Sequence, residues 1–250
     1  MAQAGGSSSS SGRSAGARLA RGALIVIEGL DRSGKSTQVS RLAHALGAGE
    51  GRARVVKFPE RTTTIGQMID GYLTKKAEVD DRAIHLLFSA NRWELAPSIL
   101  KDLEAGKHII CDRYAFSGIA YSCAKGLPFS WCLNPDAGLP LPDLTLFLSL
   151  SPEVAAQRAA YGQERYEVPA LQRKVREVFK DVGAALNRMH SRSREGEAEE
   201  GSQAWEEIDA GRTIEEVGVD LWGHVKAAVE RVKAEGQPVG RLFVEKDQQS

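Results

Sequence analysis

Residues 24–37 read LIVIEGLDRSGKST, and this stretch decides the fold. The apolar run that ends at Glu28 is short and is closed by Gly29, which is the form of a strand buried on both faces of a parallel sheet. Gly29 to Thr37 follow the pattern G-x-x-x-x-G-K-S, in which backbone N–H groups curl inward onto phosphate oxygens. A helix should begin at Lys35. A strand, a glycine loop and a helix in this order predict a site for a nucleoside triphosphate.

The side chains of this loop suit phosphate chemistry. Lys35 is expected to reach the β- and γ-phosphates, and Ser36 to offer its hydroxyl to Mg²⁺. Arg32 adds a positive charge of the kind that stabilises phosphoryl transfer. Asp31 is short and would repel a triphosphate, so we expect it to face a second substrate. The predicted ATP-binding residues of the loop are Gly29, Asp31, Arg32, Ser33, Gly34, Lys35, Ser36 and Thr37.

The rest of the chain alternates strands with helices. Short apolar runs predict four more strands, at residues 55–58, 108–112, 144–149 and 205–208. Amphipathic or capped segments predict helices at 35–47, 64–73, 80–106, 169–190 and 214–229. Pro97 is expected to break or restart the third of these helices. This order predicts an α/β, three-layer P-loop kinase fold: a five-stranded parallel sheet with helices on both faces and a short lid.

Ligands of such sheets bind beyond the carboxyl ends of the strands, where further charged residues fall. Asp112 and Arg113 end the strand at 108–112. The carboxylate can join Ser36 around Mg²⁺, and the arginine can clamp a second phosphate with its forked donors. Arg61 follows the strand at 55–58 and is expected over the same crevice.

Phe88 and Arg92 are four residues apart in a helix and therefore share one face. A buried arginine needs a partner. A flat ring beside a forked donor would suit a planar base that carries a carbonyl oxygen.

The composition excludes several classes of protein. Lys plus Arg and Asp plus Glu are 33 each, so the chain has no overall basic field to hold a nucleic-acid duplex. No apolar run approaches the roughly 20 residues of a membrane span. The spacing of Cys111, Cys123 and Cys132 matches neither a CxxC redox pair nor a zinc knuckle.

We expect one domain at residues 22–234, with a lid at about 161–168 and a surface insertion at about 191–203. Residues 1–21 are rich in Ser, Gly and Arg and lack acids, which is typical of a disordered tail or of a transit peptide. Residues 235–250 show no clear pattern, which predicts a flexible tail. The expected location is the cytoplasm, or the mitochondrion, plastid or nucleus if the N-terminal tail is a targeting segment.

Over roughly residues 22–230 the chain resembles the eukaryotic thymidylate kinases of the P-loop nucleoside monophosphate kinase superfamily. The motifs that carry the resemblance are GLDRSGKST, FPERTTTIG, LLFSANRWE, DRYAFSGIAY, GLPLPDLTLFL and ERYE. The resemblance implies transfer of the γ-phosphate of ATP to dTMP in dTTP synthesis. It also implies Mg²⁺ as cofactor, ATP and dTMP as the bound partners, and a homodimer that binds neither nucleic acid nor membrane.

The resemblance assigns roles residue by residue. The implied catalytic residues are Lys35, Arg32, Asp112 and Arg113, and the implied metal ligands are Ser36 and Asp112. Arg158 would cover the adenine of ATP, and the lid residue Arg165 would be secondary to Arg32. The implied dTMP-binding residues are Asp31, Phe58, Arg61, Phe88, Arg92, Arg113, Ser117, Gly118, Tyr121 and Tyr166.

Within that set Phe88 would stack on thymine, and Arg92 would bind its O4 atom. Arg61 and Arg113 would hold the phosphate. Tyr121 would exclude a ribose 2′-hydroxyl, although the family commonly has Phe at this position.

Two alternatives stay open on the residues alone. The first is a kinase of another nucleotide: a UMP, CMP or dUMP kinase, or a deoxynucleoside kinase. A nucleoside kinase needs a general base for the 5′-hydroxyl, whereas the arginines at 61, 92 and 113 favour a monophosphate acceptor. The second is a non-catalytic P-loop module or switch. The absence of an N-K-x-D motif argues against a GTPase, and the intact P-loop lysine and Asp-Arg pair argue against an inactive kinase.

Overall fold

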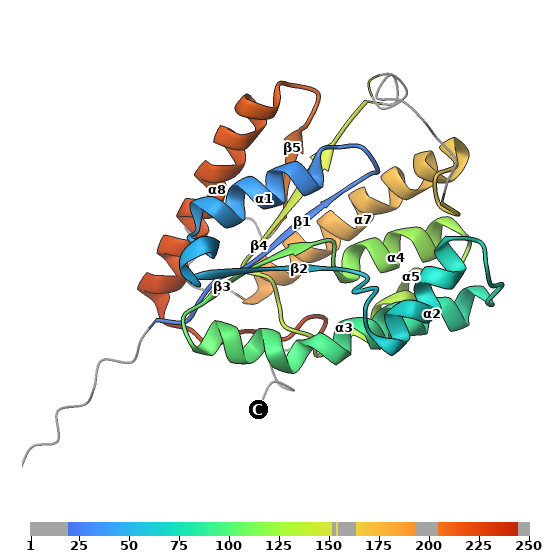
Figure 1. Ribbon diagram of the computed structural model, residues 1–250, viewed down its shortest axis with the longest axis horizontal. Helices are drawn as coiled ribbons and strands as arrows, with labels where there is room; N and C mark the ends of the chain where they lie inside the picture. Colours follow the sequence, from blue (N-terminus) through green and yellow to red (C-terminus); the bar gives the residue numbers. More distant parts are fainter. Residues whose placement is uncertain (1–19, 152–153, 155–163, 194–204, 245–250) are drawn as a thin grey trace, which may run out of the picture.

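The computed structural model describes residues 20–151, 154, 164–193 and 205–244 (Figure 1). Within these residues five strands form one parallel sheet in the order β2-β3-β1-β4-β5, which confirms the predicted fold class. The strands are β1 Leu24–Gly29, β2 Ala53–Lys57, β3 His108–Asp112, β4 Leu144–Ser149 and β5 Trp205–Asp209. The second strand lies slightly earlier than predicted, so that Phe58 follows it.

Helices cover both faces of the sheet (Figure 1). They are α1 Lys35–Ala45, α2 Thr64–Leu73, α3 Asp81–Glu104, α4 Ala115–Ala124, α5 Phe129–Leu133, α7 Pro169–Ser193 and α8 Ile214–Glu235. Two short 3₁₀ turns, Ala48–Glu50 and Asn134–Asp136, lie between them. Helices α1 and α8 pack on one face, and α3, α4 and α7 pack on the other.

The apolar run that predicted β1 explains its central position. All six of its residues are buried. Because successive side chains of a strand point to opposite faces, Leu24 and Val26 join the core beneath α3 and α4, whereas Ile25 and Ile27 join the core beneath α1 and α8. The apolar residues Leu24 to Ile27 thus supply a core on each side, and β1 occupies the middle of the sheet.

This sheet brings the predicted motifs to one edge. In the parallel register Ile27 lies opposite Asp112, and Asp112 lies opposite Lys57. The P-loop after β1, Arg113 after β3 and Phe58 after β2 are therefore neighbours in space. The order of the strands places β1 between β3 and β4, so the chain leaves adjacent carboxyl ends in different directions and opens a crevice there.

Two features differ from the expectations. Helix α3 continues through Pro97 instead of breaking there. The lost backbone hydrogen bond is tolerated because Ala96, Ile99 and Leu103 anchor the helix in the core on either side of the proline.

The second difference concerns the end of the chain. Residues 238–243 are not a loose tail, because Leu242 is fully buried and its backbone exchanges hydrogen bonds with Gly138 and Leu139. At the other end Arg21 makes a two-pronged ion pair with Asp143, at 2.7 and 2.8 Å. Residues 1–19, 161–163, 194–203 and 245–250 of the predicted tails, lid and insertion lie outside the described residues. No helix in the described ranges has the length and apolar character needed to cross a bilayer.

Candidate active site

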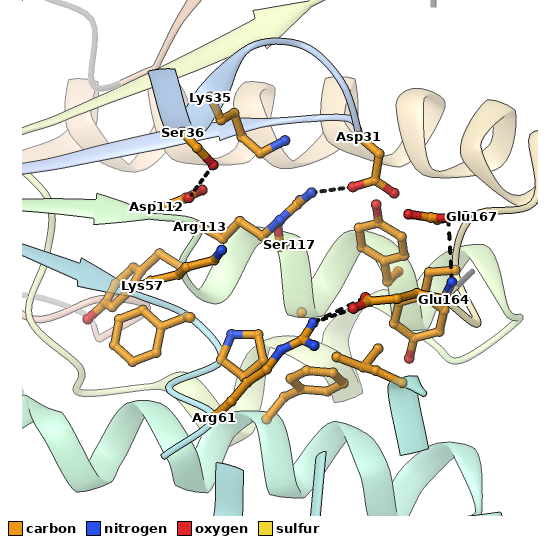
Figure 2. Close-up of a pocket in the computed structure, with 18 of the residues that line it drawn as sticks. Asp31, Lys35, Ser36, Lys57, Arg61, Asp112, Arg113, Ser117, Glu164 and Glu167 are labelled. Atoms are coloured by element: carbon orange, nitrogen blue, oxygen red, sulfur yellow. Dashed lines mark hydrogen bonds and ion pairs between the residues drawn. The ribbon is translucent and has the colours of Figure 1, made fainter. Parts of the chain in front are cut away.

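A cavity of about 540 Å³ opens at the carboxyl edge of the sheet (Figure 2). Its walls come from the P-loop, the β2–α2 connection, α3, α4 and the segment before α7. The predicted site residues that line it are Asp31, Arg32, Gly34, Lys35, Ser36, Thr37, Phe58, Arg61, Phe88, Arg92, Asp112, Arg113, Ser117, Gly118, Tyr121 and Tyr166. Gly29 and Ser33 do not line this cavity, although Ser33 lines an adjoining hollow, and Arg158 lies outside the described residues.

The P-loop backbone has the curled form that its glycines predict. Gly29 has φ +150°, and a Cβ there would lie 2.7 Å from the Leu148 carbonyl oxygen and 2.7 Å from Ser33 Oγ. Arg32 and Gly34 are left-handed, with φ of 68° and 85°. Gly34 precedes α1 and has no side chain to cap it. The first N–H groups of α1 and the positive end of its dipole therefore point at the cavity, as an anion site requires.

Lys35 is almost buried in this loop, and its Nζ donates a hydrogen bond of 2.6 Å to the Leu30 carbonyl oxygen. Burial, together with the nearby Arg113 guanidinium, lowers the pKa of Lys35 to about 7, although Asp31 and Asp112 act in the opposite direction. A lysine is held at such a pKa because its charged form lacks sufficient compensation. An anion bound beside Lys35 would therefore stabilise its charged form.

Arg113 lies between the P-loop and α4. Its backbone is left-handed, with φ 69°, and its N–H donates to the Ile27 carbonyl oxygen. One end of the guanidinium donates to the Gly29 carbonyl oxygen and to Ser117 Oγ, at 3.0 Å each. The other end contacts Asp31 Oδ1 at 2.6 Å. These contacts hold the guanidinium between the P-loop and α4.

Arg61, which the sequence predicts over the same crevice as Arg113, lies across the cavity from Arg113 (Figure 2). Two carboxylates pair with it: Asp70 of α2 and Glu164 from the segment before α7, at 2.8 Å each. The Arg61 side chain is 38% exposed, so these contacts are open to exchange with an incoming anion.

The far end of the cavity contains a buried ion pair. Arg92 Nε and Nη2 donate to the two oxygens of Asp136, at 2.9 and 2.7 Å, and both side chains are at most 2% exposed. Ser89 Oγ adds a third hydrogen bond to this carboxylate. Within the described residues no hydrogen bond from Arg92 Nη1 is recorded, so this nitrogen is the one that can serve a ligand. Phe88 lies one helical turn away in the same wall.

Gly118 allows the Arg92 guanidinium to approach α4. A Cβ at position 118 would lie 3.0 Å from Arg92 Nη2 and 3.2 Å from Nη1. These separations are shorter than a carbon atom and a guanidinium nitrogen normally tolerate. The glycine is therefore needed for the position of the arginine rather than for backbone freedom.

Tyr121 and Tyr166 close the side of the cavity near the P-loop. Their rings stack with centroids 4.9 Å apart. Gln172 of α7 places its Nε2 within hydrogen-bond distance of Asp31 Oδ2, the Tyr121 hydroxyl and the Tyr166 carbonyl oxygen. Burial raises the pKa of Tyr121 to about 12, although Arg113 opposes the shift. Tyr121 is therefore a neutral phenol throughout the physiological range.

Ser36 and Asp112 fit the metal site predicted for them. Ser36 Oγ lies 3.2 Å from Asp112 Oδ2, between the P-loop and the end of β3 (Figure 2). Two hard oxygen atoms suit Mg²⁺, which is normally bound by one or two protein oxygens together with substrate phosphates and water. No group of three or more His, Cys, Asp or Glu side chains that could hold a metal occurs in the described ranges.

Sequence reasoning missed several contributors. Asp136, the partner of Arg92, carries no local signal because it lies 44 residues away in a 3₁₀ turn. Gln172 is one polar residue on a long amphipathic helix. Lys57 lines the cavity from the last position of β2, and its place at the carboxyl end of a predicted parallel strand could have indicated it.

The fold and this site define a P-loop phosphotransferase with a second, arginine-lined pocket beside the triphosphate loop. Residues 27–205 match the family model for thymidylate kinase. The chain is 47% identical over 226 residues to the thymidylate kinase of Danio rerio, and 43% identical over 226 residues to that of Homo sapiens. Each alignment covers 89% of this chain and 98% of the relative.

A solved structure of thymidylate kinase from Candida albicans has a TM-score of 0.74 and 38% sequence identity, and the match covers 89% of this chain and 99% of that one. The chain therefore belongs to the thymidylate kinase family. The resemblance inferred from the motifs is confirmed.

Proposed function

We propose that the chain transfers the γ-phosphate of ATP to dTMP, giving ADP and dTDP, and that the cavity residues above perform this reaction. Membership of the thymidylate kinase family supports the reaction. The observation that carries the assignment of residues is the cavity itself. It is lined by the P-loop on one side and by three arginines, Arg61, Arg92 and Arg113, on the other.

The P-loop half would bind ATP. Its backbone N–H groups and Lys35 hold the β- and γ-phosphates, and the Lys35 ammonium returns to full charge when they arrive. Ser36 and Asp112 would hold Mg²⁺, which supplies charge neutralisation on the phosphates. A shallower hollow of about 330 Å³ continues from Arg32 and Thr37 to Arg212 and Val217, and it is large enough to take the nucleoside half of ATP. Arg158 would cover the adenine.

The other half would bind dTMP. Arg61 and Arg113 would exchange carboxylate partners for the phosphate of dTMP, because a phosphate offers more acceptor oxygens and more charge. Phe88 would stack on thymine, and Arg92 Nη1 would donate to its O4 atom. Asp31 would accept from the 3′-hydroxyl, and Tyr121 would fill the space of a 2′-hydroxyl. Phe58, Ser117, Gly118 and Tyr166 would form the remaining walls.

Catalysis in this arrangement consists of positioning and charge neutralisation. The phosphate of dTMP is already an anionic nucleophile, so no side chain has to remove a proton from it. Lys35, Arg32 and Arg113 would hold the two phosphates in line and stabilise the transferring group. Arg165 would play a lesser part, because its guanidinium is bound to the Tyr72 carbonyl oxygen and to Glu78 and lies 4.3 Å from the Tyr72 ring.

We also propose that the chain acts as a homodimer on free nucleotides, in the cytoplasm, or in an organelle or the nucleus if residues 1–21 form a targeting segment. Leu86 and Trp93 are 48% and 40% exposed and lie seven residues apart on α3, so they share a face. An apolar stripe of this kind suits a second copy of the chain. Sedimentation equilibrium would give twice the mass of 27.1 kDa, and a monomer at micromolar concentration would contradict the proposal.

Product analysis tests the reaction directly. The chain incubated with ATP, Mg²⁺ and dTMP should produce dTDP and ADP in equal amounts by ion-exchange chromatography. Omitting dTMP should leave ATP intact, and Lys35→Ala should lower turnover by orders of magnitude, because a charge is removed from the transition state. ADP formation that does not depend on dTMP would indicate an ATPase or a switch instead.

A further inference from the structure

A carboxylate that the reaction scheme does not use lies fully buried behind the cavity. Glu28 is the last residue of β1 before the P-loop glycine, and its side chain is 0% exposed. Its Oε1 accepts hydrogen bonds from the backbone N–H groups of Tyr114 and Ser117, at 2.9 and 3.0 Å. Its Oε2 accepts from Ser117 Oγ at 2.6 Å. Burying a carboxylate costs free energy unless hydrogen bonds or a cation compensate it, so the contacts of Glu28 must stabilise it there.

The first consequence of these contacts is structural. The N-terminal N–H groups of a helix lack partners within the helix, and a short polar side chain at the N-cap usually accepts from them. The N-cap of α4 is Tyr114, which makes no such bond. Glu28 supplies the missing acceptor from a neighbouring strand and binds the N–H of the N-cap and that of the third helical residue. Its negative charge also lies at the positive end of the helix dipole.

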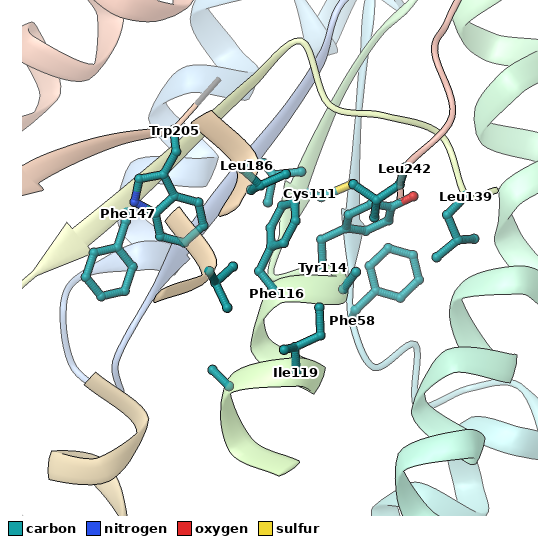
Figure 3. Close-up of a cluster of buried hydrophobic side chains, with 14 of the residues drawn as sticks. Phe58, Cys111, Tyr114, Phe116, Ile119, Leu139, Phe147, Leu186, Trp205 and Leu242 are labelled. Carbon is teal, nitrogen blue, oxygen red and sulfur yellow. The ribbon is translucent and has the colours of Figure 1, made fainter. Parts of the chain in front are cut away.

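The contacts also fix the position of α4 relative to the P-loop. Tyr114, Phe116 and Ile119 hold the helix in the apolar core (Figure 3). Glu28 belongs to the strand that leads into the triphosphate loop. The hydrogen bonds to the Glu28 carboxylate therefore connect the N-terminal end of α4, which carries Ser117, to the strand that leads into the P-loop.

The second consequence reaches Arg113. Ser117 Oγ donates its single proton to Glu28, so it can only accept from Arg113 Nη1, which lies 3.0 Å away. Glu28 thus sets the direction of the serine hydroxyl. Arg113 also has a left-handed backbone, which is unfavourable for a residue with a side chain and needs support from its surroundings.

We propose that Glu28 is a positioning residue for the acceptor phosphate, and that it acts through Ser117 Oγ on the guanidinium of Arg113. The inference rests on the proposed function, in which Arg113 binds the phosphate of dTMP. Glu28 itself touches neither substrate. Burial raises the pKa of Glu28, whereas Arg113 and the hydrogen bonds from Ser117 and Tyr114 act to lower it, so the charge of the carboxylate depends on the same partners that it holds.

A purely structural cap would predict something different. Loss of the cap would lower the stability of the protein and affect both substrates alike. Loss of the Arg113 geometry would weaken dTMP binding and leave ATP binding nearly unchanged. The test is therefore the split between the two ligands, measured by calorimetric titration of each nucleotide into the full chain.

Three variants make the comparison. Glu28→Gln keeps the shape and an oxygen for the two backbone N–H groups, but presents an N–H donor to Ser117 Oγ in place of an acceptor. Ser117→Ala keeps the carboxylate and the backbone cap and removes only the connecting hydroxyl. Glu206→Gln is the matched control, because Glu206 is a partly buried strand carboxylate on β5 outside the cavity.

The loss of a hydrogen bond to a charged group gives the expected size of the effect. Glu28→Gln and Ser117→Ala should each weaken dTMP binding by about 10- to 100-fold. ATP binding should change by less than about threefold, and Glu206→Gln should leave both affinities at the wild-type value. The double variant should bind dTMP about as weakly as Glu28→Gln alone, because both changes break one chain of contacts.

Wild-type dTMP affinity in Ser117→Ala would overturn the inference, and so would an equal loss of both ligands in Glu28→Gln. Ser117→Ala can overturn the inference even if Glu28→Gln does not fold, because the carboxylate is inferred to act through Ser117. Since Ser117 also lines the dTMP half of the cavity, support for the inference comes from Glu28→Gln and from the double variant. Failure of the proposed function looks different, since the wild-type chain itself would then show no binding of dTMP.

Discussion

Binding of ATP should transfer a proton to Lys35, and the number of protons taken up can be worked out from the structure. Lys35 is 7% exposed, and burial together with Arg113 lowers its pKa from the ordinary 10.5 to about 7. At pH 8 a group with that pKa is about 10% charged, and at pH 6 it is about 90% charged. A bound triphosphate restores the full charge. Uptake from Lys35 should therefore be about 0.9 proton per ATP at pH 8 and about 0.1 at pH 6.

Calorimetric titration with ATP and Mg²⁺, in two buffers of unequal protonation enthalpy, measures this uptake. Lys35→Arg is the control, because a guanidinium stays charged throughout this range. Subtracting its value removes protons exchanged by the nucleotide itself. Equal uptake by the wild type and Lys35→Arg at pH 8 would refute the reasoning, since Lys35 would then be fully charged before ATP arrives.

The lowered pKa of Lys35 also affects how the stability of the protein depends on pH. The pKa of Lys35 is lower in the folded chain than in the unfolded chain, so between pH 7 and 10 the unfolded chain binds more protons. The contribution of this group to the free energy of unfolding must then rise with pH across that window. In urea titrations between pH 7 and 10, the free energy of unfolding of the wild type should rise with pH relative to that of Lys35→Arg.

The remaining predictions concern the acceptor half of the cavity. Arg92→Ala leaves the buried Asp136 carboxylate without its cation, so the free energy of unfolding in urea titration should fall by about 3–5 kcal/mol. The same variant should weaken dTMP binding more than ATP binding. An equal loss of affinity for both ligands would contradict the assignment of Arg92 to the base. Gly118→Ala places a methyl group 3.0 Å from Arg92 Nη2, so calorimetry should show dTMP binding weakened by about tenfold with ATP unaffected, and wild-type dTMP affinity would show that the guanidinium can move aside. Tyr121→Ala opens space beside the sugar, so turnover of the ribose analogue of dTMP, relative to dTMP, should rise by about tenfold; an unchanged ratio would mean that another residue excludes the 2′-hydroxyl.

The parts of the site that could be predicted are those whose chemistry is local in the sequence. The P-loop is a continuous motif, and the sheet edge follows from the rule that parallel strands share their carboxyl ends. Arg113 and Arg61 were therefore predicted over one crevice from their places after β3 and β2 alone. Phe88 and Arg92 were paired by helical spacing, which is also a local property.

The parts that were missed depend on contacts between distant segments. Asp136 neutralises Arg92 across 44 residues, and nothing near it in the sequence distinguishes it from a turn aspartate. Leu242 is buried, and its backbone hydrogen-bonds to Gly138 and Leu139, yet the apolar run Leu242-Phe243-Val244 is too short to show a periodicity. The local propensity of Pro97 predicts a break in the helix, but α3 continues because the packing of Ala96 and Ile99 in the core outweighs that propensity.

The proposed function depends above all on which nucleoside monophosphate accepts the phosphate, and this preference can be measured directly. A coupled ADP-release assay with ATP and Mg²⁺ would compare kcat/KM for dTMP, dUMP, UMP, CMP and AMP. We predict that dTMP is used most efficiently by a wide margin, because Phe88, Arg92 and Tyr121 together would select thymine and deoxyribose. If UMP or CMP were preferred, the P-loop chemistry would stand, but the assignments of the base and sugar pocket would be wrong.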